Sequence, residues 1–177
     1  MSEKIKLLVR QYQRRECSKA EFVKQIQEEI GIGKENFGHY FEKILADKNP
    51  DDVESALTIL YALDENNNLI DFIHQLLLAP WHTKYEALVH ELQQRKQPES
   101  VPFIKEAMQK KFPYPESYET GTRQFINQCG HALWSIGTEA AIQAIRELSE
   151  SQDPVLRDEM CYRLSRIEGR NDYQRND

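Results

Sequence analysis

An apolar pattern that returns at a nearly fixed interval constrains this chain more than any other feature of its sequence. Leu88 follows Leu57 after 31 residues, and both lie in stretches with helical spacing of apolar residues. Cys129 follows Leu88 after 41 residues, and Met160 follows Cys129 after 31. The longer step contains a Pro- and Tyr-rich insertion at residues 112–121. An interval of this length predicts pairs of helices, in which each pair covers the apolar face of the one before.

Helix spacing and helix-end signals agree with this interval. Cys129, Ala132, Leu133 and Ile136 form an apolar stripe at i, i+3, i+4 and i+7, and Gly137 supplies the positive φ that a helix end favours. Alternation of apolar and polar residues, which would indicate strands, is missing. The pattern predicts an all-α fold of about 9–10 helices.

Several polar residues mark the starts of these helices. Ser18 and Glu21 form a capping box, in which each side chain binds a backbone N–H of the first turn. Thr138 is the expected N-cap of the helix after Gly137. Asp153 is the expected N-cap of the last helix, because proline follows it at the first helical position.

The stretch 132–164 resembles the HEAT-like repeat in its short bacterial, phycobilisome-lyase type form. The matching elements are Ala132-Leu133-x-x-Ile136-Gly137, Ala141-Ile142, Asp153-Pro154-x-Leu156-Arg157 and Leu164. The resemblance implies a short right-handed α-solenoid of stacked helix pairs. It implies binding surfaces and no particular reaction, since such a family shares an architecture.

The domain organisation follows from where the interval holds. Residues 1–50 match it only in part, and we expect them to form an N-terminal helical cap, a degenerate repeat. Residues 51–167 are expected to contain the HEAT-like repeats, with a loop at the insertion 112–121. Residues 168–177 are polar and lack an apolar stripe, so we expect a frayed tail.

Charge is concentrated in one part of the chain. Residues 51–100 contain three Lys/Arg and nine Asp/Glu, and so account for all of the net charge of −6. Such a balance disfavours nucleic-acid backbones and favours a basic protein partner. The alternative is an ordinary solvated acidic face. The acidic candidates for partner binding are Asp51, Asp52, Glu54, Asp64, Glu65 and Asp71.

Three further groups are candidates for partner binding, each with an alternative. Trp81 and His82 lie at a joint between helix pairs, where the tryptophan either packs the joint or anchors a partner. The insertion is either a binding loop or an ordinary one, and its candidates are Tyr114, Glu116, Tyr118 and Glu119. Asn127, His131 and Trp134 share a second face of one helix, unless the tryptophan lies in the core.

Catalytic and metal-binding motifs are absent from the sequence. It contains no Gly-rich phosphate loop, no G-x-S-x-G and no H-E-x-x-H, and the five histidines lack metal-ligand spacing. Cys17, Cys129 and Cys161 form neither a disulfide framework nor a metal pattern. We therefore expect no catalytic residues, no metal and no cofactor. No membrane span or signal peptide is recognisable, and a reduced, cytoplasmic setting is expected.

These observations favour a non-enzymatic, protein-binding role. The sharper hypothesis is an acidic inhibitor, such as an immunity protein that neutralises a basic, nuclease-type toxin. The alternative is a scaffold or adaptor that binds a peptide or helix in a groove. Some HEAT-like proteins are alkylpurine DNA glycosylases and others assist bilin attachment. The acidic balance disfavours the former, and the sequence shows no signature of the latter.

Overall fold

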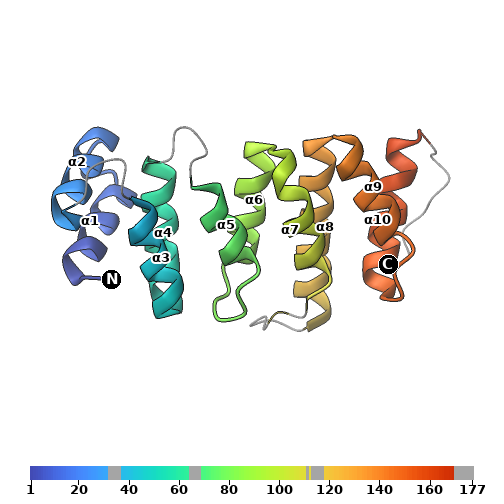
Figure 1. Cartoon of the computed structure of the whole chain (residues 1–177), viewed down its shortest axis with the longest axis horizontal. Coiled ribbons are helices and arrows are strands. Elements are labelled where there is room, and N and C mark those ends of the chain that lie inside the picture. Colours follow the sequence, from blue (N-terminus) through green and yellow to red (C-terminus); the bar gives the residue numbers. More distant parts are fainter. Residues whose placement is uncertain (32–36, 64–68, 111, 113–117, 170–177) are drawn as a thin grey trace. The chain divides into compact units, whose positions relative to one another are not determined.

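The computed structural model describes residues 1–31, 37–63, 69–110, 112 and 118–169, with only the backbone of 118–120 (Figure 1). These residues form ten α-helices and one short 3₁₀-helix, and no β-strand occurs among them. The all-α class expected from the sequence is thus confirmed. The chain divides into two compact units, Met1–Leu76 and Leu77–Asp177.

The first unit is built around α4. Its helices are α1 (Glu3–Gln13), α2 (Lys19–Ile30), α3 (Phe37–Asp47) and α4 (Pro50–Leu63), and α5 (Ile70–Leu77) begins within it. Helices α1, α2 and α3 all contact α4, and α1 also packs against α2. The first unit thus contains α4, which begins at Pro50 and buries its apolar face against the helices before it.

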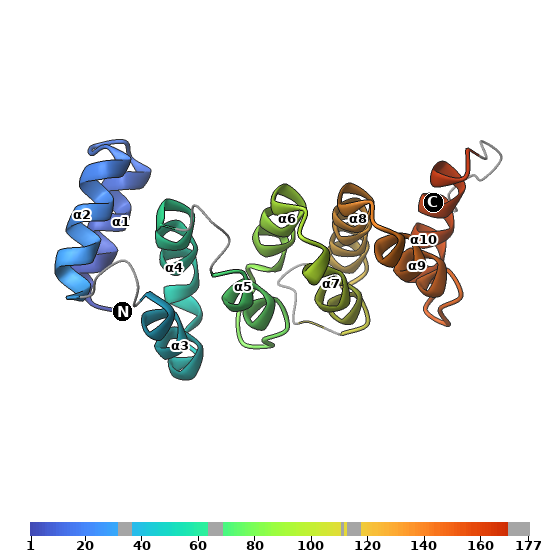
Figure 2. The same cartoon turned by 45° about the horizontal axis from the view of Figure 1, so that its top comes forward.

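The second unit has two layers of helices. Its elements are α6 (Tyr85–Arg95), η2 (Pro98–Ser100), α7 (Val101–Met108), α8 (Tyr118–Ile136), α9 (Glu139–Leu148) and α10 (Pro154–Ile167). Helix α8 packs between α6 and α10, and α7 packs against α9 (Figure 2). Leu88 of α6, Cys129 of α8 and Met160 of α10 are all fully buried. The three residues that the sequence interval relates thus all lie in the core of the second unit.

Most helix ends lie where the sequence predicted them. The Ser18 hydroxyl accepts from Glu21 N at 3.3 Å while Glu21 Oε2 accepts from Ser18 N at 2.9 Å, which completes the capping box. The hydroxyl of Thr138 and the carboxylate of Asp153 cap α9 and α10. Gly137 ends α8 with φ 66°, a value that only glycine adopts without strain.

The loop expected at the insertion 112–121 needs correction. Helix α8 begins at Tyr118, so the last part of the insertion 112–121 is helical and not loop. Apolar residues at helical spacing from Phe125 onward bury one face of α8, and they support the longer helix. On α4 the buried stripe follows Val53, Leu57 and Leu60, and Tyr61 is 40% exposed.

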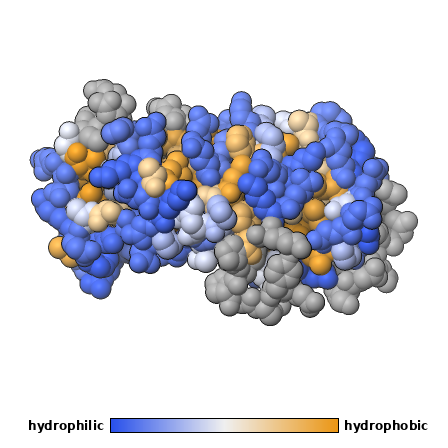
Figure 3. Space-filling view, turned by 60° about the horizontal axis from the view of Figure 1, so that its bottom comes forward, coloured by the Kyte–Doolittle hydropathy of each residue, from blue (hydrophilic) through white to orange (hydrophobic). Residues whose placement is uncertain are grey.

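The face drawn in Figure 3 is mainly hydrophilic. On the face drawn in Figure 3, hydrophobic side chains reach the surface as narrow strips between hydrophilic ones. Among the described helices, none combines the length and the hydropathy needed to cross a membrane.

Candidate partner-binding groove

A polar groove of about 380 Å³ lies between α6 and α8 in the second unit. Its lining residues are Glu86, Gln93, Gln124, Asn127, Gln128 and His131. The four residues from α8 are spaced at i, i+3, i+4 and i+7, so they form one polar stripe along the helix. This stripe lies beside the buried apolar stripe that contains Cys129 and Leu133. The same helical period thus gives α8 one face for the core and one for the groove.

Side-chain amides connect the two walls of the groove. Gln124 Nε2 donates to Glu86 Oε2, and Gln128 Nε2 donates to the backbone oxygen of Glu86, both at 3.2 Å. Gln93 Nε2 donates to Ser135 Oγ at 3.3 Å. These three bonds join α6 to α8 and therefore fix the width of the groove.

A buried ion pair of α10 supports the groove from behind. Arg163 Nε donates to Glu159 Oε1 at 2.9 Å. Asn127 Nδ2 donates to the same oxygen at 3.3 Å, and Arg163 Nη1 lies 3.1 Å from His131 Nδ1. Because arginine nitrogens only donate, His131 Nδ1 accepts, and the proton of the neutral ring is on Nε2. The pair thus orients two residues of the polar stripe.

Sequence reasoning did not identify Glu159 and Arg163. Leu156 and Met160 of α10 are buried, whereas Leu164 and Ile167 of the same helix are only half-buried. An acidic and a basic residue at i and i+4, flanking the buried Met160, were the available signal.

Trp134 is exposed at the C-terminal end of α8. Its exposed fraction is 51%, and its ring centroid lies 6.3 Å from that of His131. The alternative in which this tryptophan lies in the core is therefore excluded. Asn127 and His131 line the groove, and Trp134 lies one turn beyond it.

The joint before α6 is packed. His82 is 2% exposed, and its Nδ1 accepts from Lys84 N at 3.0 Å. Its ring lies 4.6 Å from that of Tyr85, while Trp81 is half-buried. The expectation that His82 offers its side chain to a partner is thus corrected, because the imidazole is used inside the joint.

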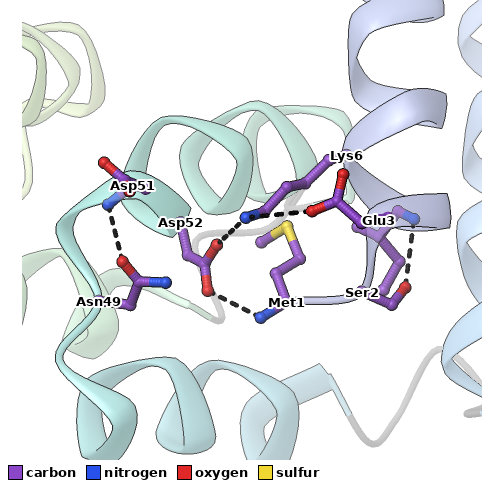
Figure 4. Close-up of polar contacts among 8 residues, drawn as sticks. Met1, Ser2, Glu3, Lys6, Asn49, Asp51 and Asp52 are labelled. Carbon is purple, nitrogen blue, oxygen red and sulfur yellow. Dashed lines mark hydrogen bonds and ion pairs between the residues drawn. The ribbon is translucent and has the colours of Figure 1, made fainter.

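The acidic candidates of the first unit divide into buried and exposed residues. Asp52 is 3% exposed, and its carboxylate lies 2.7 Å from the Met1 amine and 3.0 Å from Lys6 Nζ (Figure 4). Burial raises the pKa of Asp52, but the amine and Lys6 together outweigh it, so the pKa falls below its usual value. The expectation that Asp52 contacts a partner is therefore corrected, because its carboxylate is buried and paired inside the first unit.

The structure describes three of the five remaining acidic candidates. Asp51, Glu54 and Asp71 are exposed. Asp64 and Glu65 lie outside the described residues.

The insertion is described only at its ends. Phe112 is 4% exposed and stacks on Tyr85 at 4.0 Å, so the start of the insertion is held in the core of the second unit. Tyr114 and Glu116 lie outside the described residues. The backbone of Tyr118 and Glu119 forms the first turn of α8, and their side chains are not described.

Metal and thiol chemistry have little support among the described residues. No three His, Cys, Asp or Glu side chains converge in a way that could hold a metal ion within the ranges described. Cys129 is fully buried, which raises the pKa of its thiol well above the usual value. Cys161 is half-buried, and its Sγ lies 3.5 Å from the backbone oxygen of Ser149.

Comparisons of the chain with protein-family models, with curated proteins and with solved structures found no match.

Proposed function

We propose that this chain is a non-enzymatic protein-binding module, a short right-handed α-solenoid of HEAT-like helix pairs that binds its partner across α6 and α8. The observation that carries the proposal is Trp134, 51% exposed at the end of the polar groove. Tryptophan is enriched at the energetic centres of interfaces, because it buries a large area for a small loss of side-chain entropy. A groove with polar walls beside such an anchor supports contact with another protein.

The partner is proposed to be basic, and the module to act as an inhibitor such as the immunity protein of a nuclease-type toxin. The support is the distribution of charge. Residues 51–91 contain one Lys/Arg and eight Asp/Glu, and Asp51, Glu54 and Asp71 are exposed. Acidic residues facing a basic partner raise the association rate and exclude acidic competitors.

A scaffold or adaptor that binds an extended peptide is the second candidate. The observation that favours it is the composition of the groove, where four of the six lining residues carry uncharged amides. Amides can bind the N–H and C=O groups of a peptide backbone without any requirement for charge. Binding of this kind would change little with ionic strength.

Calorimetric titration tests the proposal. The partner is either the protein that co-purifies with the chain from its native host or the product of the neighbouring gene. Trp134→Ala should weaken binding at least about tenfold, since hot-spot truncations cost about 2 kcal/mol or more. Leu7→Ala is the matched control, because Leu7 is 49% exposed and lies in the first unit. Equal affinities of the two variants would contradict the proposal.

The salt dependence of the same titration separates the two candidates. Raising NaCl from about 0.05 M to about 0.5 M shortens the screening length severalfold. An acidic inhibitor should then bind at least about tenfold more weakly, whereas an adaptor should change little. Inhibition of the partner's own activity in the same mixtures identifies an inhibitor directly.

A further inference from the structure

We propose that the groove between α6 and α8 is a subsite for an arginine side chain of the partner. The inference rests on the proposed function and names the chemical group that the groove would take. Its basis is the direction in which the groove's side-chain amides must face.

For three of the amides, the hydrogen-bond partners decide which side carries the NH₂ group and which carries the oxygen. The nitrogens of Gln124, Gln128 and Asn127 lie against the Glu86 carboxylate, the Glu86 backbone oxygen and the Glu159 carboxylate. Carboxylate and carbonyl oxygens only accept hydrogen bonds. Turning any of these amides over would place oxygen against oxygen, so the NH₂ groups must face these partners. The amide oxygens consequently face away from them.

The groove is therefore rich in acceptors. Within the described residues, no side-chain or backbone donor reaches the side-chain oxygens of Gln124, Asn127 or Gln128. The Glu86 carboxylate adds negative charge beside them. Each of these amides also keeps a second N–H, so the lining contains donors as well, and Glu86 supplies its negative charge. A phosphate or a carboxylate would be repelled by the like charge of the Glu86 carboxylate here.

A guanidinium group matches this arrangement. It carries five N–H donors in one plane and no acceptor, and it is less strongly hydrated than an ammonium group. Two N–H groups on one edge of the guanidinium can bind the Glu86 carboxylate through charge-assisted hydrogen bonds. The remaining N–H groups can bind amide oxygens. Trp134, one turn beyond His131, would contact the residue next to the arginine.

Arg163, the cation behind the groove, does not compete for these acceptors. Arg163 binds Glu159 and His131 on the α10 side, and its side chain is 5% exposed. Its charge is offset by the Glu159 carboxylate at 2.9 Å. Arg163 is therefore unavailable to the Glu86 carboxylate, which accepts from Gln124 Nε2.

Titration of the ¹⁵N-labelled full chain with short peptides tests the proposal. The probes are acetylated and amidated Gly-X-Gly tripeptides in which X is arginine, lysine or citrulline, the uncharged analogue of arginine. The arginine peptide should shift the side-chain NH₂ signals of Gln124, Asn127 and Gln128 saturably. It should bind at least about tenfold tighter than citrulline and about threefold tighter than lysine. Equal binding of arginine with either probe would overturn the assignment, and so would shifts confined to other residues.

A matched pair of variants locates the site. Glu86→Gln keeps a side-chain oxygen that can accept from Gln124, and so preserves the fold while removing the charge. It should lower the affinity for the arginine peptide to that for citrulline. Glu99→Gln, at an exposed residue of η2 outside the groove, should change nothing. Unchanged affinity in Glu86→Gln would also overturn the assignment.

The two proposals can fail separately. If the arginine peptide does not bind but Trp134→Ala weakens binding of the whole partner, the arginine subsite is wrong and the binding face stands. If the peptide binds in the groove but Trp134→Ala has no effect on the partner, the subsite stands and the tryptophan anchor is wrong.

Discussion

Arg163 donates through Nε to Glu159 Oε1 at 2.9 Å, and both side chains are only 5% exposed. Removing two charges from water is costly, and their attraction in the interior returns roughly that cost. The pair therefore contributes orientation more than stability. Through Asn127 and His131 it sets the positions of two side chains that line the groove.

Loss of one partner of this pair should be severe. Arg163→Met leaves the Glu159 carboxylate buried without its cation, which costs about 3–5 kcal/mol in comparable pairs. Urea denaturation followed by circular dichroism measures the loss. Adding Glu159→Met to the same chain should recover most of it, because the charge left unpaired is then absent.

An exposed pair of the same unit supplies the control. Arg146 Nη1 lies 4.0 Å from Glu139 Oε1, and these side chains are 45% and 85% exposed. Arg146→Met should cost less than about 1 kcal/mol, since exposed ion pairs contribute little. Similar losses for Arg146→Met and Arg163→Met would mean that burial does not determine the cost.

Gly130 should be required by the close approach of α8 to α10. A Cβ atom at this position would lie 2.8 Å from Met160 Cε and 3.3 Å from Arg163 Nε. Met160 is fully buried and Arg163 is tied to Glu159, so neither can give way freely. Overpacking of this kind costs about 1–3 kcal/mol, more than alanine's advantage in helix propensity of about 1 kcal/mol. We expect Gly130→Ala to lower the free energy of unfolding by about 1 kcal/mol.

Gly38 is the matched control for this substitution. It lies in α3, and no atom comes within 4 Å of a Cβ built there. Gly38→Ala should therefore stabilise the chain by about 0.5 kcal/mol through helix propensity alone. The prediction for Gly130 fails if both substitutions stabilise.

The sequence predicted features that depend on neighbouring residues. The capping box of Ser18 and Glu21 is local chemistry, and so is the positive φ of Gly137. The buried positions Leu88 and Cys129 follow from one period applied repeatedly. The groove could be predicted in part, because the stripe of polar residues on α8 has the same period.

Burial of charge could not be predicted in this way. Asp52 lies in the most acidic part of the chain, yet its partners are the Met1 amine, 51 residues away, and Lys6. Glu159 is buried because α10 meets Asn127 of α8. Whether a charged residue is exposed depends on partners that only the tertiary packing brings to it.

Removing the charge of Asp52 should destabilise the chain at neutral pH and have little effect in acid. The pKa of Asp52 is lowered in the folded state, so its contribution is complete above the unfolded value of about 3.9 and is lost as the pH falls through the folded value. Asp52→Asn should cost about 2 kcal/mol at pH 7, typical for hydrogen bonds to charged groups. The difference from wild type should shrink below about pH 4.

Asp51 gives the control for this pH dependence. It is the adjacent residue of α4 and is exposed. Asp51→Asn should change the free energy of unfolding by less than about 1 kcal/mol, the size of a charge effect in a helix first turn. A loss for Asp52→Asn that stays constant from pH 7 to pH 3 would show that the ion pair is not its cause.

Tyr85 should make the second unit sensitive to alkaline pH. Its ring is fully buried, stacks on Phe112, and its hydroxyl donates to the Ala79 oxygen at 2.9 Å. Burial raises the pKa of Tyr85 to about 12, from an unfolded value of about 10. Because the folded pKa is raised, this contribution to stability is complete below pH 10 and is lost as the pH rises towards 12.

Comparison of Tyr85→Phe with wild type isolates this effect. At pH 7 the variant should be less stable by about 1 kcal/mol, because the hydroxyl's hydrogen bond is lost. Above pH 10 its deficit should shrink and then reverse, since phenylalanine has no proton to lose. Urea denaturation at pH 7, 9, 10 and 11 measures the trend. A deficit that stays the same at every pH would mean that the Tyr85 hydroxyl ionises as readily in the folded chain as in the unfolded one.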